Sequence, residues 1–169
     1  MNRTLLALFV IIIGFGACKK TTDPLIHYNA QKAIDDKLIQ DYLKANNLTA
    51  QRTDSKSTDT SGVYYIIKPG EEGAGNDLFT SSTQVTVGYV GRILTSQVVI
   101  AHTDNFHPSY RLSDVMRGWQ LGIPLMKKNG KIRLFIPSRY AYGPYAQDSL
   151  HLPANSVLDF DIQLYNVIN

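Results

Sequence analysis

The first regular pattern in the chain is a helical one, between residues 25 and 48. Apolar residues recur there at intervals of three and four, as on one face of an amphipathic helix. We expect this stripe to pack on the chain's own domain; homodimerisation through residues 25–48 is the alternative, because the stripe also suits a partner helix. The stripe comprises Ala30, Ile34, Leu38, Ile39, Tyr42 and Leu43, and the polar face comprises Asp35, Asp36, Lys37, Gln40, Asp41 and Lys44.

Beyond a polar segment at residues 49–62, the period of the pattern changes to that of β-strands. Short runs rich in β-branched and aromatic residues follow, and alternation is clearest in the last of them. Residues 112–126 are typical of a short helix, which Pro124 limits to two or three turns. Strands surrounding one short helix predict an α+β domain with a largely antiparallel sheet. The predicted strands are residues 63–67, 85–89, 131–136 and 158–165.

Composition narrows the classes of function. The chain has 169 residues, of which 44% are hydrophobic, so it can build one domain of ordinary size with short appendages. A balance of 17 basic against 14 acidic residues, without a basic run, does not favour nucleic-acid binding. The single cysteine excludes an internal disulfide and a cysteine zinc cluster.

The N-terminal residues have the pattern of a targeting signal. Arg3 precedes an apolar run at residues 5–13 and a small-residue stretch at 14–17, which is the order of a secretory signal peptide. The apolar run is shorter than the roughly 20 residues of a spanning helix, so an uncleaved anchor is the weaker interpretation. Cys18 follows directly, and this arrangement resembles the lipobox of bacterial lipoproteins, in which the cysteine is acylated after cleavage. We therefore expect a signal peptide at 1–17, a lipidated tether at 18–24, and attachment to the membrane of the bacterial cell envelope, on the periplasmic or outer-membrane side.

The sequence contains none of the common catalytic or metal-binding motifs. There is no Gly-x-Ser-x-Gly elbow, no phosphate-binding loop and no dinucleotide fingerprint. The histidines form no His-Glu-x-x-His arrangement and have no accompanying carboxylate cluster, so surface positions are the better interpretation. We expect neither a metal nor a cofactor. The four histidines are His27, His102, His107 and His151.

Aromatic residues provide the remaining candidate site. Tyr89, Trp119, Tyr142 and Phe160 lie in four different predicted elements, beside Gly or Pro turns. A core role is the better interpretation of any one of them alone. However, Trp119 near a helix start and Tyr142 on a tight turn could give an apolar pocket the polar tips that orient a ligand.

Four segments occur in the order and spacing of a known family. They are residues 85–91 (VTVGYVG), 115–119 (VMRGW), 136–143 (IPSRYAYG) and 152–160 (LPANSVLDF). Together they resemble the FKBP-type peptidyl-prolyl cis-trans isomerases over residues 61–169. The resemblance implies a half-open antiparallel sheet wrapped around a short α-helix, here preceded by an N-terminal helix and linker at residues 25–60.

The resemblance also implies roles for particular residues. It makes Trp119 the floor of a substrate pocket and assigns substrate carbonyls to the Met116 backbone N–H and the Tyr142 hydroxyl. The family's catalytic positions correspond to Tyr89, Trp119, Tyr142 and Phe160, and its substrate-binding positions to Val99, Val115, Met116 and Leu152. Proline-containing, unfolded or partly folded polypeptides are the substrates it implies.

One departure from the family pattern affects the expected activity. Val99 and Ile100 stand where the family usually has a Phe-Asp pair, so the pocket loses aromatic area and a carboxylate. The leading hypothesis is a lipid-anchored prolyl isomerase that acts outside the cytoplasm. A catalytically weak or inactive peptide-binding or chaperone lipoprotein is the alternative, and a purely structural envelope lipoprotein is a third.

Overall fold

The computed structural model describes residues 24–53 and 62–169. The predicted signal peptide, the lipidation site Cys18 and nearly all of the tether lie outside these residues. Within the two described segments, no helix is both long and apolar enough to cross a membrane.

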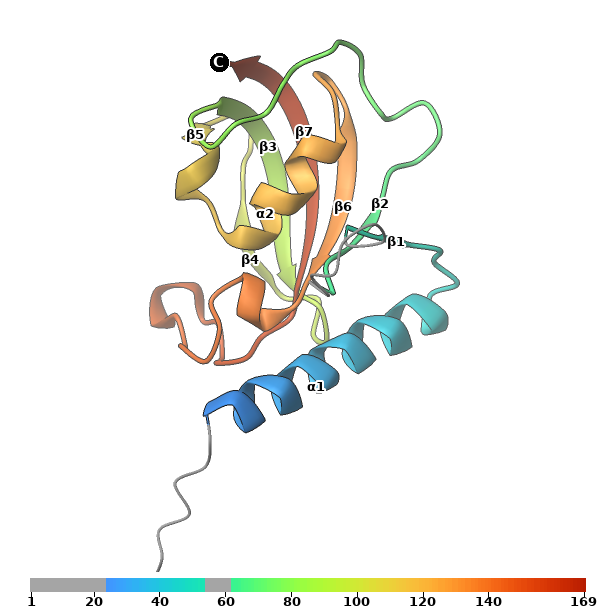
Figure 1. Cartoon of the computed structure of the whole chain (residues 1–169), viewed down its shortest axis with the longest axis vertical. Helices are drawn as coiled ribbons and strands as arrows, with labels where there is room; N and C mark the ends of the chain where they lie inside the picture. The colour runs from blue at the N-terminus through green and yellow to red at the C-terminus, as the bar shows by residue number, and fades with distance from the viewer. Residues whose placement is uncertain (1–23, 54–61) are drawn as a thin grey trace, which may run out of the picture.

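An antiparallel sheet of seven strands forms the body of the domain (Figure 1). Its centre is the long pairing of β3 (Gln84–Ile93) with β7 (Leu158–Ile168), and β6 (Lys131–Ile136) pairs with the other edge of β7. The strand order is β1-β2-β6-β7-β3-β4, and β5 also pairs with β3. The sheet and its short helix confirm the predicted α+β class. The remaining strands are β1 (Gln51–Arg52), β2 (Tyr64–Ile66), β4 (Val99–His102) and β5 (Ser109–Arg111).

The short helix α2 (Arg117–Gly122) lies against one face of the sheet because two glycines allow a close approach. A Cβ at Gly122 would lie 2.5 Å from Leu134 Cδ1, and a Cβ at Gly118 would overlap the side chain of Ile136. The helix predicted over residues 112–126 is in fact three pieces, since 3₁₀ turns η1 (Leu112–Asp114) and η2 (Ile123–Leu125) flank α2.

The core forms between α2 and the sheet through the alternation of strand residues. In β6, Ile132, Leu134 and Ile136 are buried in this core, whereas Lys131 is exposed on the opposite face. The same cluster contains Val85 and Val87 of β3, Leu158, Phe160, Ile162 and Leu164 of β7, and Trp119 of α2.

The N-terminal helix α1 (Pro24–Ala45) lies across one end of the sheet (Figure 1). Its buried positions are Asp35, Ile39 and Leu43, spaced by four residues along one face. Ile39 and Leu43 join a second apolar cluster with Tyr64, Leu94, Phe135 and Val157. The helix therefore packs on its own domain, as expected.

The predicted apolar stripe of α1 is wrong at its N-terminal half. Ala30 and Ile34 are exposed, Ile34 with 52% of its surface accessible, while Asp35, assigned to the polar face, is fully buried. The reason is that Asp35 has hydrogen-bond partners on the domain, which an apolar-periodicity argument cannot detect.

Substitutions at two isoleucines of α1 test this docking. We expect Ile39→Ala to lower the free energy of unfolding by about 2–5 kcal/mol, because the cavity left in the second cluster cannot be refilled fully. Ile34→Ala, one turn away and half exposed, should change it by less than about 0.5 kcal/mol. Urea denaturation followed by circular dichroism measures both, and equal effects would contradict the docking.

Candidate functional site

A cavity of about 440 Å³ opens between α2, the sheet and the segment that follows β6. Its walls are mostly aromatic and apolar, which is typical of ligand-binding sites. The lining residues are Tyr89, Ala101, Tyr110, Asp114, Val115, Met116, Trp119, Ala141, Tyr142 and Phe160.

Trp119 lines this cavity, and three aromatic rings lie close to its own ring. Its ring lies 5.0 Å from Tyr89 and 5.3 Å from Phe160 between centroids, both in edge-to-face geometry, and 6.2 Å from Tyr110. Such contacts add about 0.5–1.5 kcal/mol each beyond the buried area, so they hold the rings in fixed orientations. The Trp119 indole Nε1 is buried and has no hydrogen-bond partner among the described residues.

Tyr89 keeps its phenol neutral at ordinary pH. Burial, and after it the hydrogen bond with Tyr110, raise the pKa of Tyr89 to about 12. The two hydroxyl oxygens lie 3.3 Å apart. This corner of the cavity therefore presents the protonated hydroxyl of Tyr89 rather than a charge.

Tyr142 lies on the opposite wall, on a turn built around Ser138. The N–H groups of Ala141 and Gly143, on either side of Tyr142, donate to the Ser138 carbonyl at 2.9 and 2.8 Å. Gly143 has a φ of +62°, in the left-handed region that glycine adopts at no steric cost. Burial raises the pKa of Tyr142. Its hydroxyl has no hydrogen-bond partner among the described residues, so it remains available to a ligand.

A second available donor is the backbone N–H of Met116, at the start of α2. It makes no hydrogen bond within the described residues. The Gln120 side chain donates to the Val115 carbonyl at 2.8 Å, and this carbonyl belongs to the same planar peptide unit as the Met116 N–H. Gln120 thus fixes the direction of that N–H. Gln120 was not predicted as a site residue. Its place one residue beyond Trp119 was the only feature of the sequence that could have indicated it.

The structure brings together six of the eight predicted pocket residues, namely Tyr89, Val115, Met116, Trp119, Tyr142 and Phe160. Their catalytic and binding roles stay predictions. Leu152 is only 2% exposed and belongs to the hydrophobic core, outside the cavity lining. Val99 is 49% exposed and also lies outside it.

Ala101 occupies the place in the cavity wall that the sequence analysis gave to Val99. The β3–β4 pairing has a register shift between Gly91 and Arg92, and Gly91 pairs with Ala101. A count of residues along the chain cannot detect such a shift. Strand β4 therefore contributes only a methyl group to the cavity.

Three further lining residues were not predicted as site residues: Tyr110, Asp114 and Ala141. Asp114 is the only carboxylate in the lining, and its Oδ1 accepts a hydrogen bond from the Ser113 hydroxyl at 2.8 Å. Ala141 lies within the predicted family segment at residues 136–143, and Tyr110 precedes the helix predicted over residues 112–126, so their places in the sequence were the available signal.

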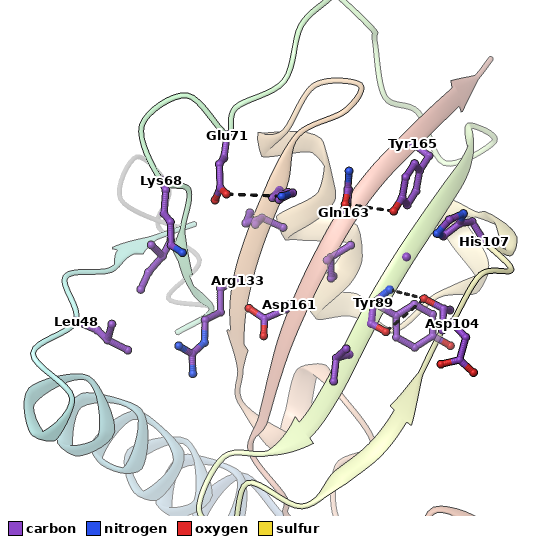
Figure 2. Close-up of a pocket in the computed structure, with 17 residues that line it drawn as sticks. Leu48, Lys68, Glu71, Tyr89, Asp104, His107, Arg133, Asp161, Gln163 and Tyr165 are labelled. Atoms are coloured by element: carbon purple, nitrogen blue, oxygen red, sulfur yellow. Dashed lines mark hydrogen bonds and ion pairs between the residues drawn. The ribbon is translucent and has the colours of Figure 1, made fainter.

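A second hollow, of about 480 Å³, lies on the sheet face that is turned away from α2 (Figure 2). Several charged and polar side chains line it beside apolar ones, and some of them interact with one another, such as Lys131 with Glu71 at 3.8 Å and Tyr165 with Gln163 at 3.2 Å. We assign the candidate site to the aromatic cavity, because the Tyr142 hydroxyl and the Met116 N–H in its lining have no hydrogen-bond partner among the described residues. No three His, Cys, Asp or Glu side chains in residues 24–53 and 62–169 gather as a metal site.

Known proteins are similar to this chain in sequence and in fold. The chain is 34% identical over 140 residues to FkpA, an FKBP-type peptidyl-prolyl cis-trans isomerase of Buchnera aphidicola (subsp. Schizaphis graminum), a match covering 82% of this chain and 53% of that protein. It is 35% identical over 104 residues to FK506-binding protein 1 of Saccharomyces cerevisiae, covering 60% and 88% respectively. The crystal structure of FkpA from Escherichia coli superposes with a TM-score of 0.60 at 26% identity, over 85% of this chain and 63% of that one.

The chain spans about half the length of the curated FkpA relatives that it matches. The model of the family described as FKBP-type peptidyl-prolyl cis-trans isomerase matches residues 75–165, which include most of the sheet, α2 and every residue of the aromatic cavity. The chain therefore belongs to the FKBP-type peptidyl-prolyl cis-trans isomerase family.

Proposed function

We propose that this protein catalyses cis–trans isomerisation of prolyl peptide bonds in unfolded or partly folded polypeptides outside the cytoplasm, attached to the cell envelope through a lipid on Cys18. One observation carries the catalytic part of the proposal: the lining of an aromatic cavity includes the Tyr142 hydroxyl and the Met116 N–H, donors that have no hydrogen-bond partner among the described residues.

The reaction needs a suitable environment more than a reactive group. Amide resonance gives rotation about the peptide bond a barrier of about 18–20 kcal/mol. The planar amide has more charge separation than the twisted one, so water stabilises the ground state. A dry cavity withdraws this stabilisation, and transfer of the imide into it lowers the barrier.

The two donors supply the other part of the mechanism. A substrate carbonyl that accepts a hydrogen bond from Tyr142 or from Met116 is held beside the proline ring while the bond rotates. Interactions that are stronger in the twisted geometry than in the planar one raise the rate. Each tenfold gain needs only about 1.4 kcal/mol of such differential stabilisation.

A peptide-binding module with weak or no catalysis is the second candidate function. Ala101 favours it, because β4 contributes a methyl group and no carboxylate to the cavity wall. A cavity with only a methyl group at this wall would still accept a proline ring, but it would hold the ring less firmly during rotation than a wall with a larger side chain would.

Homodimerisation through residues 25–48 stays a prediction. Ile39 and Leu43 of α1 are occupied by the chain's own domain, so a dimer would have to use the exposed Tyr28 and Ile34. Sedimentation analysis of the Ile34→Ala variant beside the unaltered chain tests this interface.

Replacing the hydroxyl of Tyr142 tests the isomerase function. We expect Tyr142→Phe to lower kcat/KM for a proline tetrapeptide about three- to tenfold, the effect of one lost hydrogen bond in the transition state. Tyr145→Phe is the matched control, since Tyr145 is 72% exposed and lies outside the cavity, and it should leave the rate unchanged. A protease-coupled assay measures both.

Two outcomes of that assay are informative. Equal activity of Tyr142→Phe and the unaltered chain would contradict the role of the hydroxyl. No acceleration by the unaltered chain, with peptide binding still visible as a change in Trp119 fluorescence, would support the second candidate function.

The rate should not depend on ionisation of Tyr89 at ordinary pH. Because the pKa of Tyr89 is raised to about 12, its stabilising neutral form is fully present below pH 10 and is lost only as the pH rises towards 12. We expect constant kcat/KM from pH 7 to about 10 in a magnetisation-exchange NMR assay. A Tyr89-dependent fall in rate centred below pH 9, absent from Tyr89→Phe, would contradict this.

The anchor is tested at Cys18. We expect the unaltered chain to partition with bacterial membranes and Cys18→Ala to be released from them, because no acyl chain can be attached. Cell fractionation with an antibody against the folded domain measures the distribution. Complete retention of Cys18→Ala in the membrane fraction would rule out lipidation as the anchor.

A further inference from the structure

We propose that Asp35 of the N-terminal helix α1 is a positioning residue for the aromatic cavity, acting through Ser138 on the turn that carries Tyr142. This inference deepens the proposed isomerase function and rests on it. It assigns to α1 a part in the geometry of the site, in addition to any part in anchoring.

Asp35 is a fully buried carboxylate with three hydrogen bonds. Its Oδ2 accepts from the Ser138 backbone N–H at 2.9 Å and from the Ser138 hydroxyl at 2.7 Å, and its Oδ1 accepts from Gln31 Nε2 at 2.7 Å. Hydrogen bonds to a charged acceptor are stronger than neutral ones. The donor groups of Ser138 are therefore held by a residue 103 positions earlier in the chain.

Ser138 also bonds directly to the turn in the cavity wall. While its N–H and hydroxyl bond to Asp35, its carbonyl accepts the N–H groups of Ala141 and Gly143. Those two residues flank Tyr142, so one buried residue links α1 to the backbone on both sides of the tyrosine. The Tyr142 hydroxyl makes no hydrogen bond to residues 24–53 or 62–169, so within them the backbone turn sets the position of this side chain.

A second contact joins the same two segments. The Arg139 guanidinium lies 5.9 Å from the Tyr28 ring of α1 and 5.0 Å from the Tyr140 ring, within the range of cation–π attraction. The segment that begins at Ser138 therefore touches α1 at more than one place.

Packing alone does not account for a carboxylate at this position. One and two turns further along the same face, Ile39 and Leu43 dock the helix with apolar side chains. Burying a charge costs more free energy than burying an isoleucine unless hydrogen bonds compensate it. Removal of the carboxylate would leave the buried Ser138 N–H unpaired, so the turn would have to shift to satisfy it.

The experiment compares four variants in the full chain, assayed where each is folded by circular dichroism. We expect Asp35→Ala to lower kcat/KM about five- to tenfold, within the loss expected for removal of the Tyr142 hydroxyl itself, since small displacements of a positioning group are costly. Asp35→Asn keeps an acceptor for Ser138 and should lose less than about threefold. Asp41→Ala, at an exposed site on the same helix, should match the unaltered chain. Ile39→Ala, which weakens docking without touching Ser138, should keep most of the activity.

A double-mutant cycle tests whether Asp35 acts through Tyr142. In a Tyr142→Phe background, Asp35→Ala should cost less than about twofold, because the hydroxyl that it positions is already absent. Additive losses would overturn the proposal, as would full activity of folded Asp35→Ala. A loss in Ile39→Ala equal to that in Asp35→Ala would also overturn it, because helix docking in general would then be responsible.

Amide hydrogen exchange gives a readout that does not need catalysis. In Asp35→Ala the amides of Ala141 and Gly143 should exchange about tenfold faster, and in Asp35→Asn they should not. If the unaltered chain lacks isomerase activity, the proposed function fails while this measurement still tests the coupling. Unchanged exchange at both amides in Asp35→Ala would overturn the positioning role.

Discussion

The cavity depends on the short distance between α2 and the sheet. Gly118 and Gly122, one turn apart, present backbone to Ile136 and Leu134, and a side chain at either position would push the helix outward. A helix of six residues has little stability of its own, so this contact also holds it together. At that distance the ring of Trp119 meets the edges of Tyr89 and Phe160, and a cavity remains above it.

The cavity walls come from elements far apart in sequence, and the rest of the structure couples them. The Arg133 guanidinium joins the buried carboxylate of Asp159 at 2.7 Å to the Tyr42 hydroxyl of α1 at 2.9 Å. At the other end of the same helix face, Asp35 binds Ser138. Helix α1 is therefore part of the same packed unit as the sheet and the Tyr142 turn, although it lies outside the segment matched by the family model.

The two faces of the sheet carry different kinds of polar groups: ion pairs lie on the outer face, and mostly neutral groups line the cavity on the inner face. On the outer face, Arg92 pairs with Asp161 at 2.7 Å and Lys131 with Glu71, ion pairs that contribute little to stability where water reaches them. The cavity on the inner face has neutral hydroxyl and N–H donors and one rim carboxylate, Asp114. Such a lining suits a reaction that needs desolvation and orientation, and it contains no group arranged as a nucleophile.

The sequence alone determined the elements whose residues alternate or repeat strongly, because burial of one face imposes those periods. Residues 131–136 form the predicted strand, 158–165 lie within β7, and the motif residues at 89, 119, 142 and 160 converge on one cavity. Only the tertiary structure decided that Ala101 rather than Val99 faces that cavity, because a register shift between paired strands leaves no periodic trace. It also decided that Asp35 is buried, because the hydrogen bonds that permit this come from Ser138, a residue whose proximity depends on the whole fold.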